Sequence, residues 1–569
     1  MTTPATDPIT GDTVVAYLGK RYAALKLERS SYVSHWQTIA DNMSVRAVRF
    51  QTSDKNQSGS KRNTKVINST ATFSLRTSSA GMMSGITAPS RPWFNLGVDD
   101  KAINEMHVVR MWLEGVETQI REAFRRSNLY TILPLVYDDL LTFGTSAFAV
   151  MEDEEDGIRC YPFPIGSYVL GVGHRGNVNI CIREFKQSIG QLVSEFGLEN
   201  CSTEVQRAYK EKQFDIQVDC IQAFEENPDA NEKGMESRYL PYRSVTYELS
   251  ASDGKVLSIK GTHEFPVMAP RWRVVGEDTW GNSPAMDVLG DVLQLQQMEK
   301  RKLQALEMLI NPPRSAPAGM RNEYIGTLSG EITFVPDGQL GSKVEPNYVI
   351  NPYLDHIRGE IQAVEQRIKH GLFEDLFLMI SNDERSNITA TEIQARQQEK
   401  MTALGPILER LNDEMLDPLV KRVYGILDRN FKIAPIPTEM NSPIVIEYVS
   451  ILAQAMKLQG VVGVERLVGF VGSVAAGRPD ALDKLNMDAT IDAYADMIGV
   501  PPALVNAQEV VDKARAQRAA MDKANQQMAL VSQGADTAKT MSETDVSTPS
   551  MLQQMAGVIQ QAGPQVGQP

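Results

Sequence analysis

PAMDVLGDVLQLQQMEKRKLQALEMLI at residues 284–310 and PYLDHIRGEIQAVEQRIKHGLFEDLFL at residues 352–378 are the two stretches that decide the fold. In each, apolar residues recur at three- and four-residue steps, which places them on one face of an α-helix. Pro284 stands where the first helical turn tolerates proline, and an Asn-Pro-Pro run at 311–313 ends the first helix. The sequence therefore predicts two long helices separated by a shorter segment.

The apolar stripe of the second helix has a spacing similar to that of coiled-coil contact positions. It consists of Ile357, Ile361, Val364 and Ile368. We expect these side chains to pack, either within one subunit or against a neighbouring copy. Residues 311–351, between the two helices, contain Pro, Gly and short β-like runs at 332–335 and 343–345. The predicted order is therefore helix, small β-containing excursion, helix.

The residues before 284 change character along the chain. Helical spacing comes first, and it covers residues 14–39, 66–86, 106–127 and 131–143. The second of these segments is rich in Ser, Thr, Ala and Gly, whose small side chains let helices approach closely. Residues 144–275 then show short β-like runs with turn residues between them, interrupted by helical spacing at 189–212.

The residues after 378 return to helical spacing. A capping box, Thr-Ala-Thr-Glu at 389–392, predicts a helix that reaches 429, with bends near Pro406 and Pro418. Helical spacing resumes from 444 to 528, and residues 529–569, rich in Gln, Ala, Ser, Thr and Met, are predicted to be disordered. The whole pattern predicts an α+β chain that is mainly helical.

Composition and charge limit the class of protein. The 569 residues carry a formal net charge of −14, with 42% hydrophobic and 22% charged residues, which is typical of a folded soluble protein. No uncharged apolar run of about 18 residues occurs and the first ten residues hold no Lys or Arg, so neither a membrane span nor a secretory signal is expected. We expect free, mostly buried thiols in a cytosolic setting for the four cysteines, Cys160, Cys181, Cys201 and Cys220.

The sequence lacks the common catalytic motifs. It contains no G-x-x-x-x-G-K-[ST] phosphate loop, no H-E-x-x-H metal motif and no G-x-S-x-G nucleophile elbow. His356 and His370 belong to one predicted helix but lie about 21 Å apart along it, too far to share a metal ion. The acidic pair Asp138-Asp139 is expected on a solvated helix face rather than in an acid–base pair. The sequence therefore predicts no enzyme activity, no cofactor and no metal.

A basic segment lies between the first two helices. It spans residues 46–65 and includes Arg46, Arg49, Lys61, Arg62 and Lys65. This segment could bind DNA phosphates or an acidic face of a neighbouring copy, and a plain solvated loop is an equal alternative.

Five short motifs occur in a characteristic order. They are ERSSY at 28–32 with His35 and Trp36, KRNTKVINSTAT at 61–72, AGMMSGITAPSRPWF at 80–94, WGNSPAM at 280–286, and TATEI at 389–393 with Arg396 and Glu399. In this order, over residues 28–430, they resemble podovirus head-to-tail connector proteins, which are portal proteins of tailed bacteriophages.

The resemblance implies the portal fold, with a wing, a two-helix stem, a small β-containing clip and a helical C-terminal crown, assembled as a dodecameric ring. The wing would be residues 1–283, with a helical N-terminal part and a β-rich middle. The remaining parts would be stem helices at 284–310 and 352–378, the clip at 311–351, a tunnel loop at 379–388, a long wing helix at 389–435, the crown at 436–528 and the tail at 529–569.

The resemblance also implies a function at the capsid vertex of the virion, after assembly in the host cytoplasm. The ring would form the channel for DNA packaging and ejection and would attach the tail. Its partners would be copies of itself, the terminase large subunit, the major capsid and scaffold proteins, tail adaptor proteins, and double-stranded DNA that passes without sequence specificity. No membrane partner is implied.

The loop nearest to DNA would be part of the tunnel loop. It would comprise Asn382, Asp383, Glu384, Arg385, Ser386 and Asn387. Twelve copies of a chain with net charge −14 would carry about −168, which repels DNA and lets it slide. Arg385 could touch passing phosphates.

Two other classes of protein remain as alternatives. A different phage structural protein with long helices, such as a scaffold or coat protein, would form shells or monomers rather than rings. A nuclease or another enzyme would cleave DNA in the presence of Mg²⁺.

Overall fold

The structure is a computed structural model of the chain. It describes residues 11–44, 65–104, 106–231, 237–249, 256–310, 314–315, 345–346, 354–381, 405–438, 440, 443–448, 463–474, 478, 484–498, 505 and 510–525. The chain divides into two compact units, here called the N-terminal unit, Met1–Gln459, and the C-terminal unit, Gly460–Pro569.

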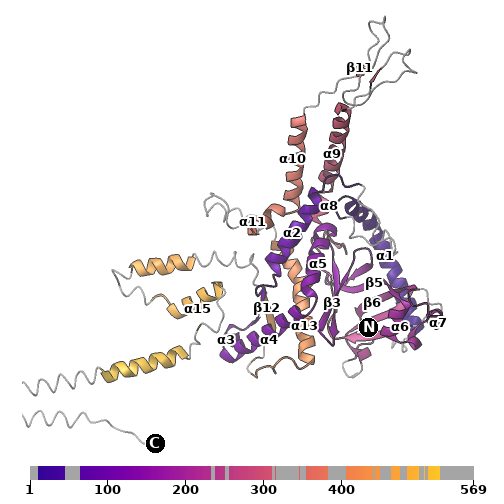
Figure 1. Cartoon of the computed structure of the whole chain (residues 1–569). Coiled ribbons are helices and arrows are strands. Elements are labelled where there is room, and N and C mark those ends of the chain that lie inside the picture. The colour runs from indigo at the N-terminus through magenta and orange to yellow at the C-terminus, as the bar shows by residue number, and fades with distance from the viewer. Residues whose placement is uncertain are drawn as a thin grey trace, which may run out of the picture. The chain divides into compact units, whose positions relative to one another are not determined.

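Helices begin the N-terminal unit (Figure 1). They are α1 Gly11–Asn42, α2 Thr70–Ile86, α3 Lys101–Asn104, α4 His107–Arg126 and α5 Leu129–Phe143. The four helical segments predicted before residue 144 are thus confirmed. The second begins at Thr70 rather than Val66, because the Asn68 side chain accepts the Thr70 N–H at 2.9 Å and sets the first turn there.

Two antiparallel sheets follow, one of five strands in the order β4-β5-β6-β7-β8 and one of three in the order β3-β2-β9. Their strands are β2 Ala147–Asp153, β3 Gly157–Phe163, β4 Tyr168–Val172, β5 Val178–Ser188, β6 Gln217–Glu226, β7 Tyr242–Glu248, β8 Val256–Thr262 and β9 Val267–Met268. The helical interruption is confirmed as two short helices, α6 Ile189–Phe196 and α7 Thr203–Lys210. Each begins at a serine whose hydroxyl accepts a backbone N–H of the first turn.

The core of the N-terminal unit joins these helices and sheets. Trp36 of α1, Trp93 and Trp280 are all fully buried in it. The rings of Trp36 and Trp280 meet edge to face with centroids 4.9 Å apart, an arrangement that aromatic pairs favour. The long first helix is therefore anchored directly beside the segment that starts the predicted helix pair.

The two predicted long helices are present, and each is broken once. The first consists of α8 Pro284–Asp287 and α9 Leu289–Ile310, and the second of α10 Leu354–Gly371 and α11 Glu374–Ser381. Figure 1 shows α9 and α10 side by side, and they run antiparallel. In the excursion between them, β10 Arg314–Ser315 pairs with β11 Glu345–Pro346, and the β-like run predicted at 332–335 lies outside the described residues.

The end of the N-terminal unit is helical and then extended. Residues 405–411 are helical, a π-helical turn follows at Asn412–Leu416, and α13 covers Asp417–Arg429. The wide turn lies at the bend predicted near Pro418, which has no N–H for the carbonyl four residues earlier. Residues 389–404 of this predicted helix lie outside the described residues.

The helix predicted to start at residue 444 was wrong at its beginning. Residues Ile444–Tyr448 form strand β12, which pairs antiparallel with β1, Phe94–Val98. The apolar residues of this stretch are mostly β-branched or aromatic, which favours a strand once a partner strand is present. The chain therefore returns to its own N-terminal part before the C-terminal unit begins.

The C-terminal unit contains helices at 463–474 and 510–525, with α15 Met487–Ile498 between them. These helices agree with the helical spacing predicted there. Tyr494 of α15 donates to Glu465 Oε1 at 2.8 Å, and Arg515 forms two hydrogen bonds with the Asp488 carboxylate at 2.6 and 2.7 Å. Across both units, no described helix is long and apolar enough to span a membrane.

Candidate functional site at the base of the helix pair

Asn68 joins the helix pair to the start of α2. Its Nδ2 donates to Glu365 Oε1 of α10 at 2.9 Å and to Glu299 Oε1 of α9 at 3.3 Å. Its backbone N–H donates to Gln296 Oε1 at 2.9 Å, and Gln296 Nε2 donates to the Asn68 carbonyl at 2.8 Å. Because Gln296 is buried, these bonds are shielded from water and are costly to lose. One short segment thus holds both long helices in register.

The two long helices break at the same level. The break between α8 and α9 is at Val288, and the break between α10 and α11 is at Leu372–Phe373. A Cβ atom on Gly371 would lie 2.3 Å from Val288 Cγ1, so a larger residue here would force Val288 to shift. Phe373 has a φ of +62°, which a bulky residue rarely adopts, and its ring lies 5.8 Å from the Trp272 ring. Local backbone strain therefore redirects α11 relative to α10.

The redirected helix α11 packs on small residues of α2. Ser78 Oγ donates to the Leu372 carbonyl at 2.7 Å. One turn further along α2, a Cβ atom on Gly81 would lie 2.3 Å from the Cβ of Phe377. The small residues of segment 66–86 predicted such a close approach between helices, and the structure confirms it. The contact fixes the position of α11 against the core.

The segment predicted to contact DNA leaves from the end of α11. Ser74 of α2 forms a short hydrogen bond with the Glu374 carboxylate at the start of α11, and α11 ends at Ser381. The α2 face therefore positions the start of α11, and the segment continues from the other end of this helix. The predicted loop residues lie outside the described residues; they are Asn382, Asp383, Glu384, Arg385, Ser386 and Asn387.

The predicted packing residues of α10 lie in the core of their own chain. Ile361, Val364 and Ile368 are buried, and Ile357 is half-buried against the same cluster. These side chains therefore pack within their own chain, and a contact with a neighbouring copy stays a prediction. The outer edge of the pair is polar, where Arg367 Nη2 lies 3.0 Å from Asp291 Oδ1 of α9.

The predicted basic segment is described at one residue. Lys65 is exposed, and its Nζ lies 2.6 Å from Asp41 Oδ2 of α1. The other basic residues named for this segment lie outside the described residues; they are Arg46, Arg49, Lys61 and Arg62.

Sequence reasoning missed a buried arginine that holds α13 against the sheets. Arg422 is buried, and its Nε donates to the Val150 carbonyl of β2 at 2.7 Å. Its Nη1 lies 3.2 Å from Glu264 Oε2. Burial lowers the pKa of Arg422 to about 10, and the nearby Glu264 carboxylate opposes that change. The sequence does not indicate this role, because an arginine on a helix is expected to be exposed to solvent.

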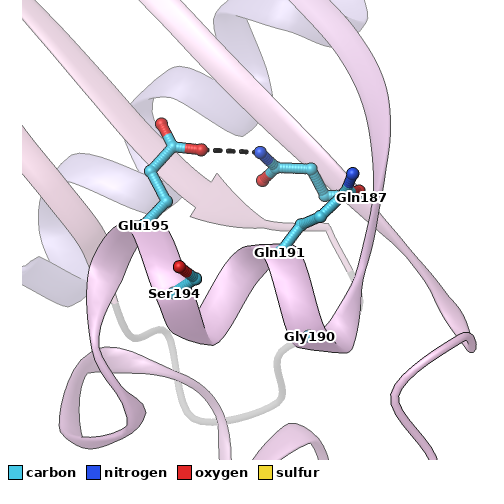
Figure 2. A pocket seen from close by; sticks show the side chains of 5 residues that line it. All are labelled: Gln187, Gly190, Gln191, Ser194 and Glu195. Atoms are coloured by element: carbon cyan, nitrogen blue, oxygen red, sulfur yellow. Dashed lines mark hydrogen bonds between the residues drawn. The ribbon is translucent and has the colours of Figure 1, made fainter.

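Two features of the described residues bear on catalysis, the grouping of possible metal ligands and a surface pocket. Among them, no group of three or more His, Cys, Asp or Glu is placed to hold a metal ion. A surface pocket on α6 is lined by Gln187, Gly190, Gln191, Ser194 and Glu195 (Figure 2). There Gln187 Nε2 donates to Glu195 Oε2 at 2.6 Å, and no histidine or cysteine lines the pocket to activate the Ser194 hydroxyl.

The four cysteines are free and buried, as predicted. Burial raises the pKa of Cys160, Cys181 and Cys220 to about 12. Because the thiolate is the reactive form, these three thiols are inert at neutral pH.

The expectation that Asp138 and Asp139 lie on a solvated helix face was wrong. Both are half-buried in α5. Burial raises the pKa of both carboxyls, and that of Asp139 lies well above its ordinary value. The Asp138 charge raises the Asp139 pKa further, whereas a hydrogen bond with Ser146 lowers it. Their surroundings therefore favour the neutral form of both carboxyls.

Comparison with known proteins identifies the family. The sequence profile described as "Bacteriophage head to tail connecting protein" matches residues 16–505. The "Portal protein" of Salmonella phage epsilon15 is 42% identical over 541 residues, covering 94% of this chain and 97% of its own length. The "Probable portal protein" of Bordetella phage BPP-1 is 37% identical over 533 residues, covering 94% of this chain and 96% of its own length.

Among solved structures, the chain has a weaker likeness. A chain described as "Neck of empty GTA particle computed with C6 symmetry" covers 71% of this chain and 86% of its own length, at 9% identity and a TM-score of 0.32. That likeness is too low to support an argument, whereas the sequence matches extend over nearly the whole chain. The chain therefore belongs to the bacteriophage head to tail connecting protein family.

Proposed function

We propose that this chain is a portal protein. It forms a ring at the capsid vertex through which DNA enters and leaves the head and to which the tail attaches. The observation that carries the proposal is the similarity to two proteins named as portal proteins, at 42% and 37% identity over 94% of the chain. The antiparallel pair of α9 and α10, with an excursion between the two helices, is the arrangement that a stem and clip require.

Electron microscopy of the purified chain tests this proposal. We expect rings with a central channel. Spherical shells, or monomers at micromolar concentration, would contradict the proposal and favour a scaffold or coat protein instead.

The proposed parts of the portal follow the elements of the structure. The helix pair is the stem, residues 311–351 are the clip, residues 379–388 are the tunnel loop, and residues 1–283 with 389–435 are the wing. We assign the crown to the C-terminal unit rather than to residues 436–528, because β12 pairs with β1 of the wing. Membership of the connector family supports a dodecameric ring as the form of the protein in the virion.

The partners follow from that position. The clip docks the terminase large subunit during packaging and tail adaptor proteins afterwards, while the wing faces the major capsid and scaffold proteins. Assembly takes place in the host cytoplasm, and double-stranded DNA passes through the channel without sequence-specific contacts.

The proposed DNA contact is the loop that follows α11. The close packing of α11 on α2 gives this loop a fixed starting point in each subunit. Asp383 and Glu384 repel the phosphates, so that DNA slides, and Arg385 makes transient contacts with them. The acidic net charge of −14 per chain supports repulsion as the main effect.

Charge reversal in the loop tests its role. We expect the double variant Asp383→Lys with Glu384→Lys to assemble rings normally and to package DNA poorly, because two negative charges per subunit become positive and attract DNA instead of repelling it. The matched control is Glu154→Lys with Glu155→Lys, two exposed residues at the turn between β2 and β3. Packaging yield per capsid is the measurement. Equal packaging by both double variants would show that the loop does not face DNA.

The proposed role needs no catalysis. The ring incubated with DNA and Mg²⁺ should leave the DNA intact on a gel. Reproducible cleavage by the purified protein would support the enzyme alternative.

A further inference from the structure

A small group of polar side chains lies inside the apolar core of the N-terminal unit. Thr142 of α5 and Tyr168 of β4 are fully buried, and Ser146, just after α5, is buried too. Asp139, one turn before Thr142 on α5, is half-buried. Aromatic rings surround the group, and the ring of Trp280 has its centroid 5.7 Å from that of Tyr168. Oxygen atoms from a helix and from a strand are thus placed in a part of the core that is otherwise apolar.

Two of these side chains have an oxygen atom without a hydrogen-bond partner among the described residues. They are Thr142 Oγ1 and the Tyr168 hydroxyl. A buried threonine on a helix commonly donates to the carbonyl four residues earlier, and Thr142 makes no such bond. Because most buried polar atoms in proteins are hydrogen-bonded, and an unpaired one is costly, each of the two hydroxyls requires a partner.

Asp139 lies close to both hydroxyls. Asp139 and Thr142 are three residues apart on α5, so their side chains share one side of the helix. Burial raises the pKa of Tyr168, and the nearby Asp139 carboxyl raises it further. The carboxyl bonds to Ser146, but it forms no direct hydrogen bond with either hydroxyl. Polar groups that lie close together in a core without bonding directly are typically bridged by an internal water molecule.

The chemistry of these groups indicates water rather than an ion. Among the described residues, no group of three or more His, Cys, Asp or Glu is placed to hold a metal ion. An anion would lie beside the Asp139 carboxyl and be repelled by it whenever this group is ionised. A water molecule both donates and accepts, so it can donate to the carboxyl and still bond to the two hydroxyls.

The two hydroxyls belong to residues that are fixed in place through their backbone. The Thr142 carbonyl accepts from Ser283 Oγ at 2.8 Å, and Ser283 is the residue from which α8 begins. The Tyr168 carbonyl accepts from Arg29 Nη1 of α1 at 2.7 Å. One hydroxyl is thereby held at the base of the helix pair and the other in the five-stranded sheet.

We propose that the core of the N-terminal unit contains a binding site for one internal water molecule, held by the Tyr168 hydroxyl, Thr142 Oγ1 and the Asp139 carboxyl. The water donates to the carboxyl, accepts from the Tyr168 hydroxyl and forms its third bond with Thr142. It connects β4 of the five-stranded sheet to α5, beside the start of the helix pair. This inference is independent of the proposed function, because every group in it lies within one subunit.

Replacing the threonine by its isostere tests whether its hydroxyl has a partner. Thr142→Val exchanges the hydroxyl for a methyl group, and valine and threonine have similar helix propensities. If the hydroxyl binds water, we expect the equilibrium constant for unfolding to rise about fivefold, as urea unfolding measures. The control is Thr118→Val on α4, where the hydroxyl is exposed and the constant should change much less. Unchanged or increased stability of Thr142→Val would show that its hydroxyl has no partner and would overturn the inference.

A double-mutant cycle tests whether the two hydroxyls share one water. Tyr168→Phe removes the second hydroxyl, and it should also destabilise the protein. The double variant with Thr142→Val should lose less than the sum of the two single losses, because the same water is disturbed in each. Tyr161→Phe, which removes an exposed hydroxyl, should combine additively with Thr142→Val. Additive losses for Thr142→Val and Tyr168→Phe would contradict a shared water.

A density map detailed enough to show ordered water tests the site directly. We expect a peak within about 2.5–3.0 Å of the Tyr168 hydroxyl and of the Asp139 carboxyl. The same map of Tyr168→Phe with Thr142→Val should lack the peak. A Tyr168 hydroxyl bonded directly to the carboxyl, with no peak between them, would overturn the inference.

Discussion

The two units of the chain differ in the exposure of their large apolar side chains. In the N-terminal unit, Trp36, Trp93 and Trp280 are fully buried in one core that joins helices and sheets. In the C-terminal unit, Phe470 and Ile491 are exposed on helices joined by polar pairs. A core stabilises a subunit before assembly, whereas an exposed apolar face gains stability from contact with another surface. The first unit therefore has a core of its own, whereas the described helices of the second unit expose their apolar side chains.

Removing one large apolar side chain from each unit tests this difference, and it should give the largest effect. Trp280→Ala leaves a cavity beside Trp36, and we expect it to lower the free energy of unfolding of the monomer by about 3–5 kcal/mol. Phe470→Ala should lower it by less than about 0.5 kcal/mol, because this side chain is exposed in the subunit. Urea unfolding followed by circular dichroism measures both changes. Losses of similar size would mean that the C-terminal helices have a core in the monomer.

Two glycines of the N-terminal unit test how closely its helices pack. Gly81→Ala puts a methyl group against Phe377, and we expect a loss of about 1–3 kcal/mol in the free energy of unfolding. Gly290→Ala, in α9, adds the same methyl group where nothing lies within 4 Å, and should raise it by about 0.5–1 kcal/mol. The two melting temperatures should therefore move in opposite directions. Shifts of the same sign would show that α11 is not closely packed on α2.

The smallest expected effect concerns the half-buried carboxyl of Asp139 in α5. Because burial raises the folded-state pKa of Asp139, its stabilising contribution is present below the unfolded value and is lost as pH rises through the folded value. Asp139→Asn should therefore raise the melting temperature at pH 7 by about 2–4 °C, and this gain should shrink as the pH falls toward 4.

Asp153 provides the control for this pH dependence. Hydrogen bonds from the Asp156 and Glu155 backbone N–H groups lower the pKa of Asp153, so its stabilisation is present above the unfolded value. Asp153→Asn should give no gain at pH 7. A gain for Asp139→Asn that does not depend on pH would mean that ionisation is not its cause.

The long helices could be predicted from the sequence because their spacing is a local property. The stripe from Ile357 to Ile368 lies in neighbouring turns of one helix, and it packs into the core as that spacing indicates. The breaks in the same helices could not be predicted. They depend on the contact between Gly371 and Val288, which a local pattern does not contain.

The candidate site also has features that could be predicted from the sequence and features that could not. The small residues around Gly81 predicted a close helix contact, because small size is visible in the sequence. The bonds from Asn68 to Glu365 and Glu299 carry no periodic signal, since their partners lie in distant segments. Strand β12 was predicted as helix for a related reason: five apolar-rich residues fit either period, and the partner strand alone decides between them.

The pairing of β1 with β12 also determines when the subunit can finish folding during its synthesis. The two strands are about 350 residues apart in the chain. At about 5–20 residues per second, the ribosome releases β12 roughly 20 to 70 s after β1. Until β12 is released, β1 has no partner strand. The N-terminal unit can therefore complete its fold only when nearly all of it has been synthesised. A chain whose translation stops before residue 444 therefore lacks the partner strand of β1.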